Sequence, residues 1–128
     1  MLQERNFGDL RGTPYAELGF DMFAPGYAPP NGETWELFHA RVDRAWALVQ
    51  ARLPGPAGNL AVVTHGLVCR SLAGRRLRLP DGHEAPERWE NTALTIVEDR
   101  VPWRVQLLNC AAHLDDLDTQ PAPDSGAV

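Results

Sequence analysis

The feature that most constrains the fold of this chain is an apolar run that ends in a histidine and a glycine. Residues 58–66 read Gly-Asn-Leu-Ala-Val-Val-Thr-His-Gly, and the apolar residues of 67–72 follow with helical spacing. The run predicts a strand that delivers His65 at the start of a helix, where open α/β sheets bind ligands. The unpaired backbone N–H groups of a helix start favour anions such as phosphate. A buried strand whose final His bonds only locally is the alternative.

Three further segments extend this pattern along the chain. Residues 2–12 read Leu-Gln-Glu-Arg-Asn-Phe-Gly-Asp-Leu-Arg-Gly, and residues 30–34 read Pro-Asn-Gly-Glu-Thr. Leu-Asn-Cys-Ala-Ala-His-Leu follows at 108–114. The order Leu-x-Glu-x-x-x-Gly-x-x-x-Gly, Gly-Glu-Thr and Thr-His-Gly resembles the histidine phosphatase superfamily, also called phosphoglycerate-mutase-like. The resemblance runs from Leu2 to about Leu114.

One part of the superfamily pattern is missing. Members open with a strand ending in Arg-His-Gly, whose His takes the phosphoryl group, and these 128 residues hold no Arg-His-Gly. We therefore expect an amino-terminally truncated member, whether through gene decay, a misplaced start codon or a partial sequence. In the superfamily the absent strand lies beside the His65 strand. Residues 60–63 should then form an exposed sheet edge, through which a homo-oligomer could form.

Composition fits one soluble domain. A chain of 128 residues with 44% hydrophobic and 23% charged residues can bury a core. The net charge of -5 argues against general binding to nucleic acid or to a membrane surface. No targeting segment or membrane-spanning run is recognisable, so we expect a cytoplasmic protein. Cys69 and Cys110 lack metal-ligand spacing, and we expect two reduced thiols rather than a disulfide.

Hydrophobic periodicity predicts the remaining elements. Apolar residues recur every three or four positions over about 32–52, which indicates a long helix with Asn31 as its N-cap. Residues 13–30 are rich in Pro and Gly and predict a loop with at most a short helix. The strand-forming residues of 91–98 and the alternation of apolar and polar residues over 103–108 predict an antiparallel hairpin with one solvent-exposed face.

These elements predict an α/β fold, a three-layer α/β/α domain with a mixed sheet. The histidine-phosphatase-like domain would cover residues 1–114, incomplete because the first strand and the nucleophile are absent. Residues 115–128 are acidic and rich in Pro and Gly, with few apolar residues, which predicts a disordered tail.

The resemblance assigns roles to five residues. His65 would be the second active-site histidine and would stabilise the phosphoryl oxygens, with Gly66 and Leu67 beside it binding substrate. Glu4 would protonate the leaving alcohol and then activate water, and Arg5 would reach the substrate. A solvated surface Glu and an ordinary surface Arg are the alternatives.

Other polar residues are expected to be structural or solvated. We expect Glu33 to stabilise the start of the long helix. We expect structural or solvated roles also for His39, His83 and His113. The arginines Arg70, Arg75, Arg76 and Arg78 predict a solvated helix face rather than a basic patch. No metal-ligand spacing is present, and the resemblance requires no metal or organic cofactor.

The sequence thus predicts a phosphoric-monoester hydrolase that acts on a small phosphorylated metabolite through a phosphohistidine. A phosphatase is favoured over a mutase because residues 13–31 hold no Arg or Lys, and carry Glu17 and Asp21 instead. A second phosphate would find no cation there. The alternative is a catalytically inactive domain that binds a phosphorylated ligand or a protein, since a lost nucleophile removes most of the rate.

Overall fold

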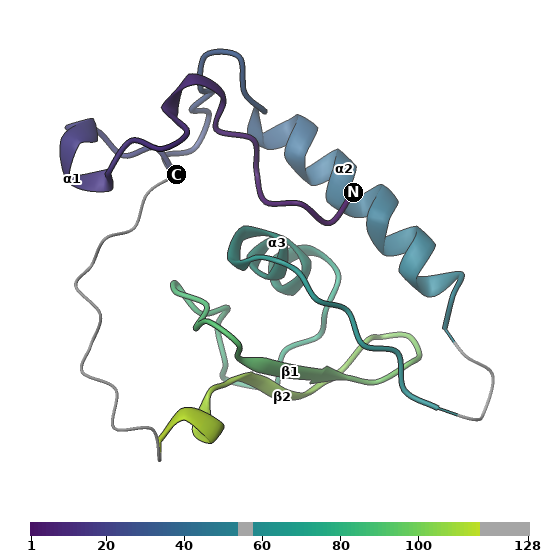
Figure 1. The fold of residues 1–128 in the computed structure, drawn as a ribbon. Coiled ribbons are helices and arrows are strands. Elements are labelled where there is room, and N and C mark those ends of the chain that lie inside the picture. Colours follow the sequence, from purple (N-terminus) through teal and green to yellow (C-terminus); the bar gives the residue numbers. More distant parts are fainter. Residues whose placement is uncertain (54–57, 116–128) are drawn as a thin grey trace.

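The computed structural model describes residues 1–53 and 58–115 (Figure 1). Its helices are α1 (Tyr15–Leu18), α2 (Trp35–Gln50) and α3 (Gly66–Arg75), and its strands are β1 (Leu94–Val97) and β2 (Val105–Cys110). Short 3-10 helices lie at Gly8–Leu10 and Ala112–Leu114. The predicted disordered tail, apart from Asp115, lies outside the described residues.

Helices α2 and α3 pack against each other and supply the core. The largest fully buried side chains are Phe38 and Val42 of α2 and Val68 of α3, and Leu72 completes the cluster. Each fully buried apolar side chain contributes roughly 1.5–3 kcal/mol to folding. The long amphipathic helix predicted over 32–52 is confirmed in a slightly shorter form.

The N-cap of α2 is Thr34, so the prediction of Asn31 is wrong. The Thr34 hydroxyl accepts a hydrogen bond from the Leu37 amide at 3.2 Å. Asn31 has a φ of 56°, and its side-chain amide donates to the Asp9 carboxylate at 3.0 and 3.1 Å. Asn tolerates this left-handed backbone, so the chain turns once more before the helix begins.

Two glycines allow the N-terminal segment, residues 1–10, to lie directly on the start of α2. A Cβ added to Gly8, whose φ is +55°, would overlap the carbonyl oxygen of Pro30. A Cβ on Gly32 would stand 2.5 Å from the Asn6 carbonyl oxygen. The Glu33 amide donates to that same Asn6 oxygen at 2.8 Å. The two pieces of backbone therefore approach each other too closely for any side chain between them.

Strands β1 and β2 form the predicted antiparallel hairpin. Leu94 pairs with Cys110 and Val97 with Val105, with irregular register between them. One isolated parallel bridge joins Arg78 to Arg104 beside the hairpin. The α/β class is therefore confirmed in a small form, whereas the three-layer arrangement with a mixed sheet stays a prediction.

The segment before α3, residues 58–65, is neither helix nor strand. The predicted strand at 60–63 is therefore not formed, and among these residues Val63 is 92% exposed. A strand is defined by backbone hydrogen bonds to a neighbour, and the described residues supply no such neighbour here. The sequence has the apolar character of a buried strand, but its side chains face solvent.

Candidate active site

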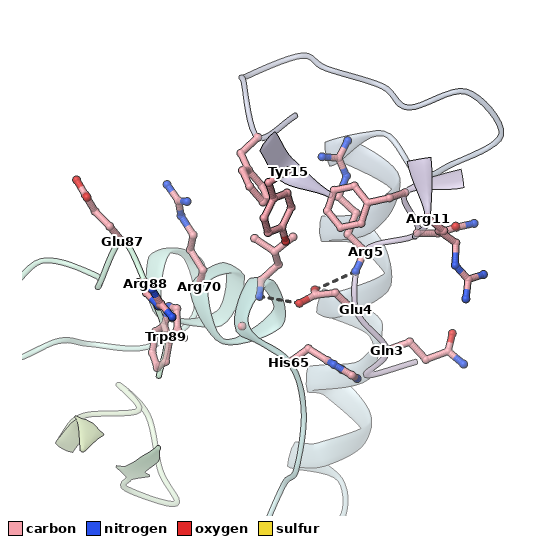
Figure 2. Close-up of a pocket in the computed structure, with 15 residues that line it drawn as sticks. Gln3, Glu4, Arg5, Arg11, Tyr15, His65, Arg70, Glu87, Arg88 and Trp89 are labelled. Atoms are coloured by element: carbon pink, nitrogen blue, oxygen red, sulfur yellow. Dashed lines mark hydrogen bonds between the residues drawn. The ribbon is translucent and has the colours of Figure 1, made fainter. Parts of the chain in front are cut away.

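An open pocket of about 840 Å³ lies between the N-terminal segment, the start of α3 and the loop before β1 (Figure 2). It brings together all of the predicted site residues, which are Glu4, Arg5, His65, Gly66 and Leu67. Because Glu4 and His65 lie far apart in the sequence, only the fold unites them.

His65 is the residue immediately before the first turn of α3. Its extended backbone, with φ of -118° and ψ of 163°, makes it the N-cap, and its carbonyl oxygen accepts the Cys69 amide at 3.0 Å. The preceding Thr64 donates its hydroxyl to the Leu2 carbonyl at 2.8 Å, which ties this segment to the chain start. The exposed His65 imidazole has no hydrogen-bond partner among residues 1–53 and 58–115.

The Glu4 carboxylate lies at the amino end of α3 (Figure 2). One oxygen accepts the Leu67 amide at 3.2 Å, and the other accepts the Arg5 amide at 2.9 Å. A carboxylate there satisfies an otherwise unpaired helix donor and interacts favourably with the helix dipole. Glu4 is therefore not a solvated surface residue, and the helix start already accommodates an oxyanion.

Arg41 of α2 holds Glu4 in this position, and sequence reasoning missed it. Its guanidinium donates to the carbonyl oxygens of Met1, Gln3 and Glu4 at 2.7, 3.0 and 3.1 Å. It also forms a bidentate pair with the Glu33 carboxylate, both contacts being 2.7 Å. This geometry is the strong form of an arginine–carboxylate contact. Backbone carbonyls leave no motif, so no sequence signal could reveal the contact.

Glu33 serves the N-terminal segment rather than the helix start, which corrects its predicted role. Its position precedes the cap residue Thr34, and its carboxylate accepts the Asn6 amide at 2.9 Å in addition to Arg41. The hydrogen bond from Arg41 lowers the pKa of the Glu33 carboxyl, although burial opposes this. Glu33 and Arg41 together anchor the backbone that carries Glu4.

Arg5 points into the protein and is 2% exposed. Its three side-chain nitrogens donate to the carbonyl oxygens of Glu33, Met22 and Tyr27 at 3.0, 3.4 and 2.6 Å. The guanidinium carbon also lies 3.9 Å from the centroid of the Trp35 ring. These contacts give Arg5 a structural role. They do not favour the predicted contact with substrate, which stays a prediction.

The pocket also contains side chains that the motifs did not indicate. These are the rings of Phe7, Tyr15, Phe23 and Trp89 and the cations of Arg11, Arg70 and Arg88. Burial raises the pKa of the Tyr15 phenol, and the nearby Glu4 carboxylate raises it further. Arg70 lines this pocket, whereas two arginines that were predicted to share its helix face, Arg75 and Arg76, pair with Asp43 at 2.9 and 2.8 Å.

The other histidines lie outside the pocket. A ring nitrogen of His39 lies 2.8 Å from the Ser71 hydroxyl, and one of His83 lies 3.3 Å from the Asp81 carbonyl oxygen. A ring nitrogen of His113 lies 3.1 Å from the Thr92 hydroxyl. Both cysteines are free thiols. Within the described ranges, no three His, Cys, Asp or Glu side chains gather as metal ligands would. Of the described helices, none is long and apolar enough to cross a membrane.

The fold and pocket define a small α/β protein in which a histidine and a carboxylate line one pocket at a helix start. The family model for the histidine phosphatase superfamily (branch 1) matches residues 1–111. The chain therefore belongs to this superfamily, as the motifs predicted, and the superfamily comprises phosphatases and mutases. No curated protein and no solved structure matches the chain.

Proposed function

We propose that this chain carries the phosphate-binding and proton-transfer groups of a phosphoric-monoester hydrolase that works through a phosphohistidine. The observation that carries the proposal is that Glu4 and the exposed His65 line the same pocket at the amino end of α3. Family membership supports the same chemistry. The substrate would be a small phosphorylated metabolite.

In the proposed first step, a histidine nitrogen attacks phosphorus and the bond from phosphorus to the ester oxygen breaks. The Glu4 carboxyl gives its proton to the leaving oxygen, so the product leaves as a neutral alcohol. In the second step Glu4 takes a proton from water, whose oxygen attacks the phosphohistidine and releases phosphate. One carboxyl group thus serves both steps and returns to its starting form.

His65 and the amides at the start of α3 would hold the phosphoryl oxygens. Negative charge spreads over these oxygens during transfer, so positioned donors lower the barrier. The Leu67 amide now binds Glu4 at 3.2 Å, so the carboxylate has to release it when a phosphoryl group arrives. Arg70, which lines the same pocket from α3, adds positive charge beside these donors.

The nucleophilic histidine of the proposed reaction would come from outside these 128 residues, which hold no Arg-His-Gly. We propose that the strand carrying it pairs with residues 60–63. The exposed apolar side chains of this segment, Val63 above all, support the proposal because they lack a sheet neighbour within the described structure. Such a strand would deliver its histidine next to His65.

Hydrolysis is proposed in preference to a mutase reaction. A mutase has to hold a doubly phosphorylated intermediate, whereas residues 13–31 carry no Arg or Lys. The part of this segment that lines the pocket contributes the rings of Tyr15 and Phe23 instead. A second candidate function is a domain that binds a phosphorylated ligand without turnover, and the missing nucleophile favours it.

Binding of inorganic phosphate tests the site. Wild-type protein should bind phosphate by isothermal titration calorimetry, and His65→Ala should weaken binding at least about tenfold, because one charge-assisted hydrogen bond is lost. His83→Ala is the matched control, since His83 is exposed and lies outside the pocket. Equal affinity in wild type and His65→Ala would contradict the proposed site.

Turnover separates the enzyme from the binding domain. The 128-residue chain should hydrolyse an aryl phosphate no faster than background. Supplying a strand that ends in Arg-His-Gly, fused or in trans, should produce turnover that Glu4→Gln slows far more for alkyl than for aryl phosphates. Turnover by the chain alone that disappears in His65→Ala would show that another residue takes the phosphoryl group.

A further inference from the structure

We propose that the substrate is the phosphate ester of an aromatic alcohol, whose ring is seated against Phe7, Tyr15 and Phe23. We call these three side chains the ring wall. The inference rests on the proposed function, and it adds the chemical class of the leaving group.

The position of Glu4 fixes the side of the pocket on which the leaving group lies. The residue that protonates the ester oxygen has to be within hydrogen-bond reach of that oxygen. The alcohol oxygen therefore lies beside Glu4. In Figure 2 Tyr15 lies above the amino end of α3, beside Glu4, and the Glu4 carboxylate raises the pKa of its phenol. An alcohol held at Glu4 therefore lies in the same pocket as the ring wall and next to its member Tyr15.

The ring wall is preformed and partly open. Phe7 is buried and meets Phe23 edge to face with ring centroids 6.1 Å apart, and Tyr15 lies 6.0 Å from Phe23. Phe23 is 37% exposed and Tyr15 is 45% exposed. A fixed inner ring with two exposed outer rings offers an aromatic ligand both edge and face contacts.

The ring wall suits an aromatic alcohol better than a sugar. Each sugar hydroxyl that leaves water needs a new hydrogen-bond partner. Of the three wall side chains, Phe7 and Phe23 have no polar atom, and Tyr15 has one hydroxyl. A phosphate head at α3 and an apolar body on the rings match the usual division of a ligand pocket into polar anchors and apolar walls.

Calorimetry with three ligands tests the inference on the chain as it exists. 1-Naphthyl phosphate should bind at least about tenfold more tightly than glycerol 3-phosphate, with inorganic phosphate as the reference that lacks a leaving group. Tyr15→Ala and Phe23→Ala should each lower the affinity ratio of 1-naphthyl phosphate to phosphate about three- to tenfold. Tyr15→Phe should keep the ratio.

Phe20→Ala is the matched control. Phe20 is also an exposed ring of the same loop, but it faces Tyr27 with centroids 5.3 Å apart and lies outside the pocket. Equal affinity for both esters, with phosphate binding still dependent on His65, would overturn the inference and leave the proposed function intact. Phosphate binding that does not depend on His65 would overturn both.

Discussion

Two irregular segments of this protein end beside the same pocket, and they are held in opposite ways. The N-terminal segment has polar partners along its length, chiefly the Arg41 guanidinium and the Glu33 carboxylate. The segment before α3 is tied by the Thr64 hydroxyl, while Val63 faces solvent. The comparison shows that side-chain donors can fix an irregular backbone, whereas an apolar strand sequence needs the backbone of another strand.

The largest expected effect is at Gly8, in the first segment. Gly8→Ala should destabilise the protein by about 3 kcal/mol or more, because the new Cβ overlaps the Pro30 backbone and the φ of +55° is unfavourable for Ala. Urea unfolding followed by tryptophan fluorescence measures the change. Gly12→Ala is the control, since its φ is +84° but no atom lies within 4 Å of the added Cβ. It should cost only about 1 kcal/mol, and an equal cost at both positions would refute the close approach.

Arg41→Ala should have the next largest effect, a loss of about 2–3 kcal/mol. It leaves the partly buried Glu33 carboxylate and several carbonyl groups without their donor. Arg44→Ala, one turn further along α2 and exposed, should change stability by less than about 0.5 kcal/mol. Similar losses for the two variants would show that Arg41 does not hold the N-terminal segment.

Acid sensitivity gives the Arg41 contact a second signature. The pKa of Glu33 is lowered in the folded protein, so its contribution to stability is fully present above its unfolded value, which is about 4.3. That contribution is lost as pH falls through the lower folded pKa. The stability difference between wild type and Arg41→Ala should therefore shrink as pH falls below about 4. A difference that stays constant to pH 2.5 would contradict the ion pair.

Val63→Lys, in the second segment, should have the smallest effect on stability, below about 0.5 kcal/mol, because the side chain is already exposed. Its effect should appear in association instead. We expect copies of the chain to pair through residues 60–63, and a lysine on that edge should shift sedimentation toward monomer. Val101→Lys, at another exposed valine, should leave the association state as it is. If neither variant changes sedimentation, association through this edge is ruled out.

The sequence predicted which residues meet in the pocket because His65 and Glu4 lie in recognisable motifs. It did not predict Arg41, whose partners include backbone carbonyls that every residue possesses. Asn31 and Thr34 are both good N-caps. The structure uses Thr34, while Asn31 lies in the left-handed turn that the Gly8 backbone approaches.

The fold was predicted best where its contacts are local. The apolar stripe of α2 and the alternation in the hairpin both encode their own geometry, and both are present. The strand at 60–63 depends on a neighbour from elsewhere, and the described structure shows the segment without one. The inward course of Arg5 was also missed, because its carbonyl partners come from three separate places in the chain.

The carboxylate of Glu4 on the amino end of α3 means that the resting pocket already contains its own counter-anion. An arriving phosphate would have to displace this carboxylate from the Leu67 amide, and would not enter an empty anion site. Stray inorganic anions would have to compete with a tethered group whose effective concentration is always high.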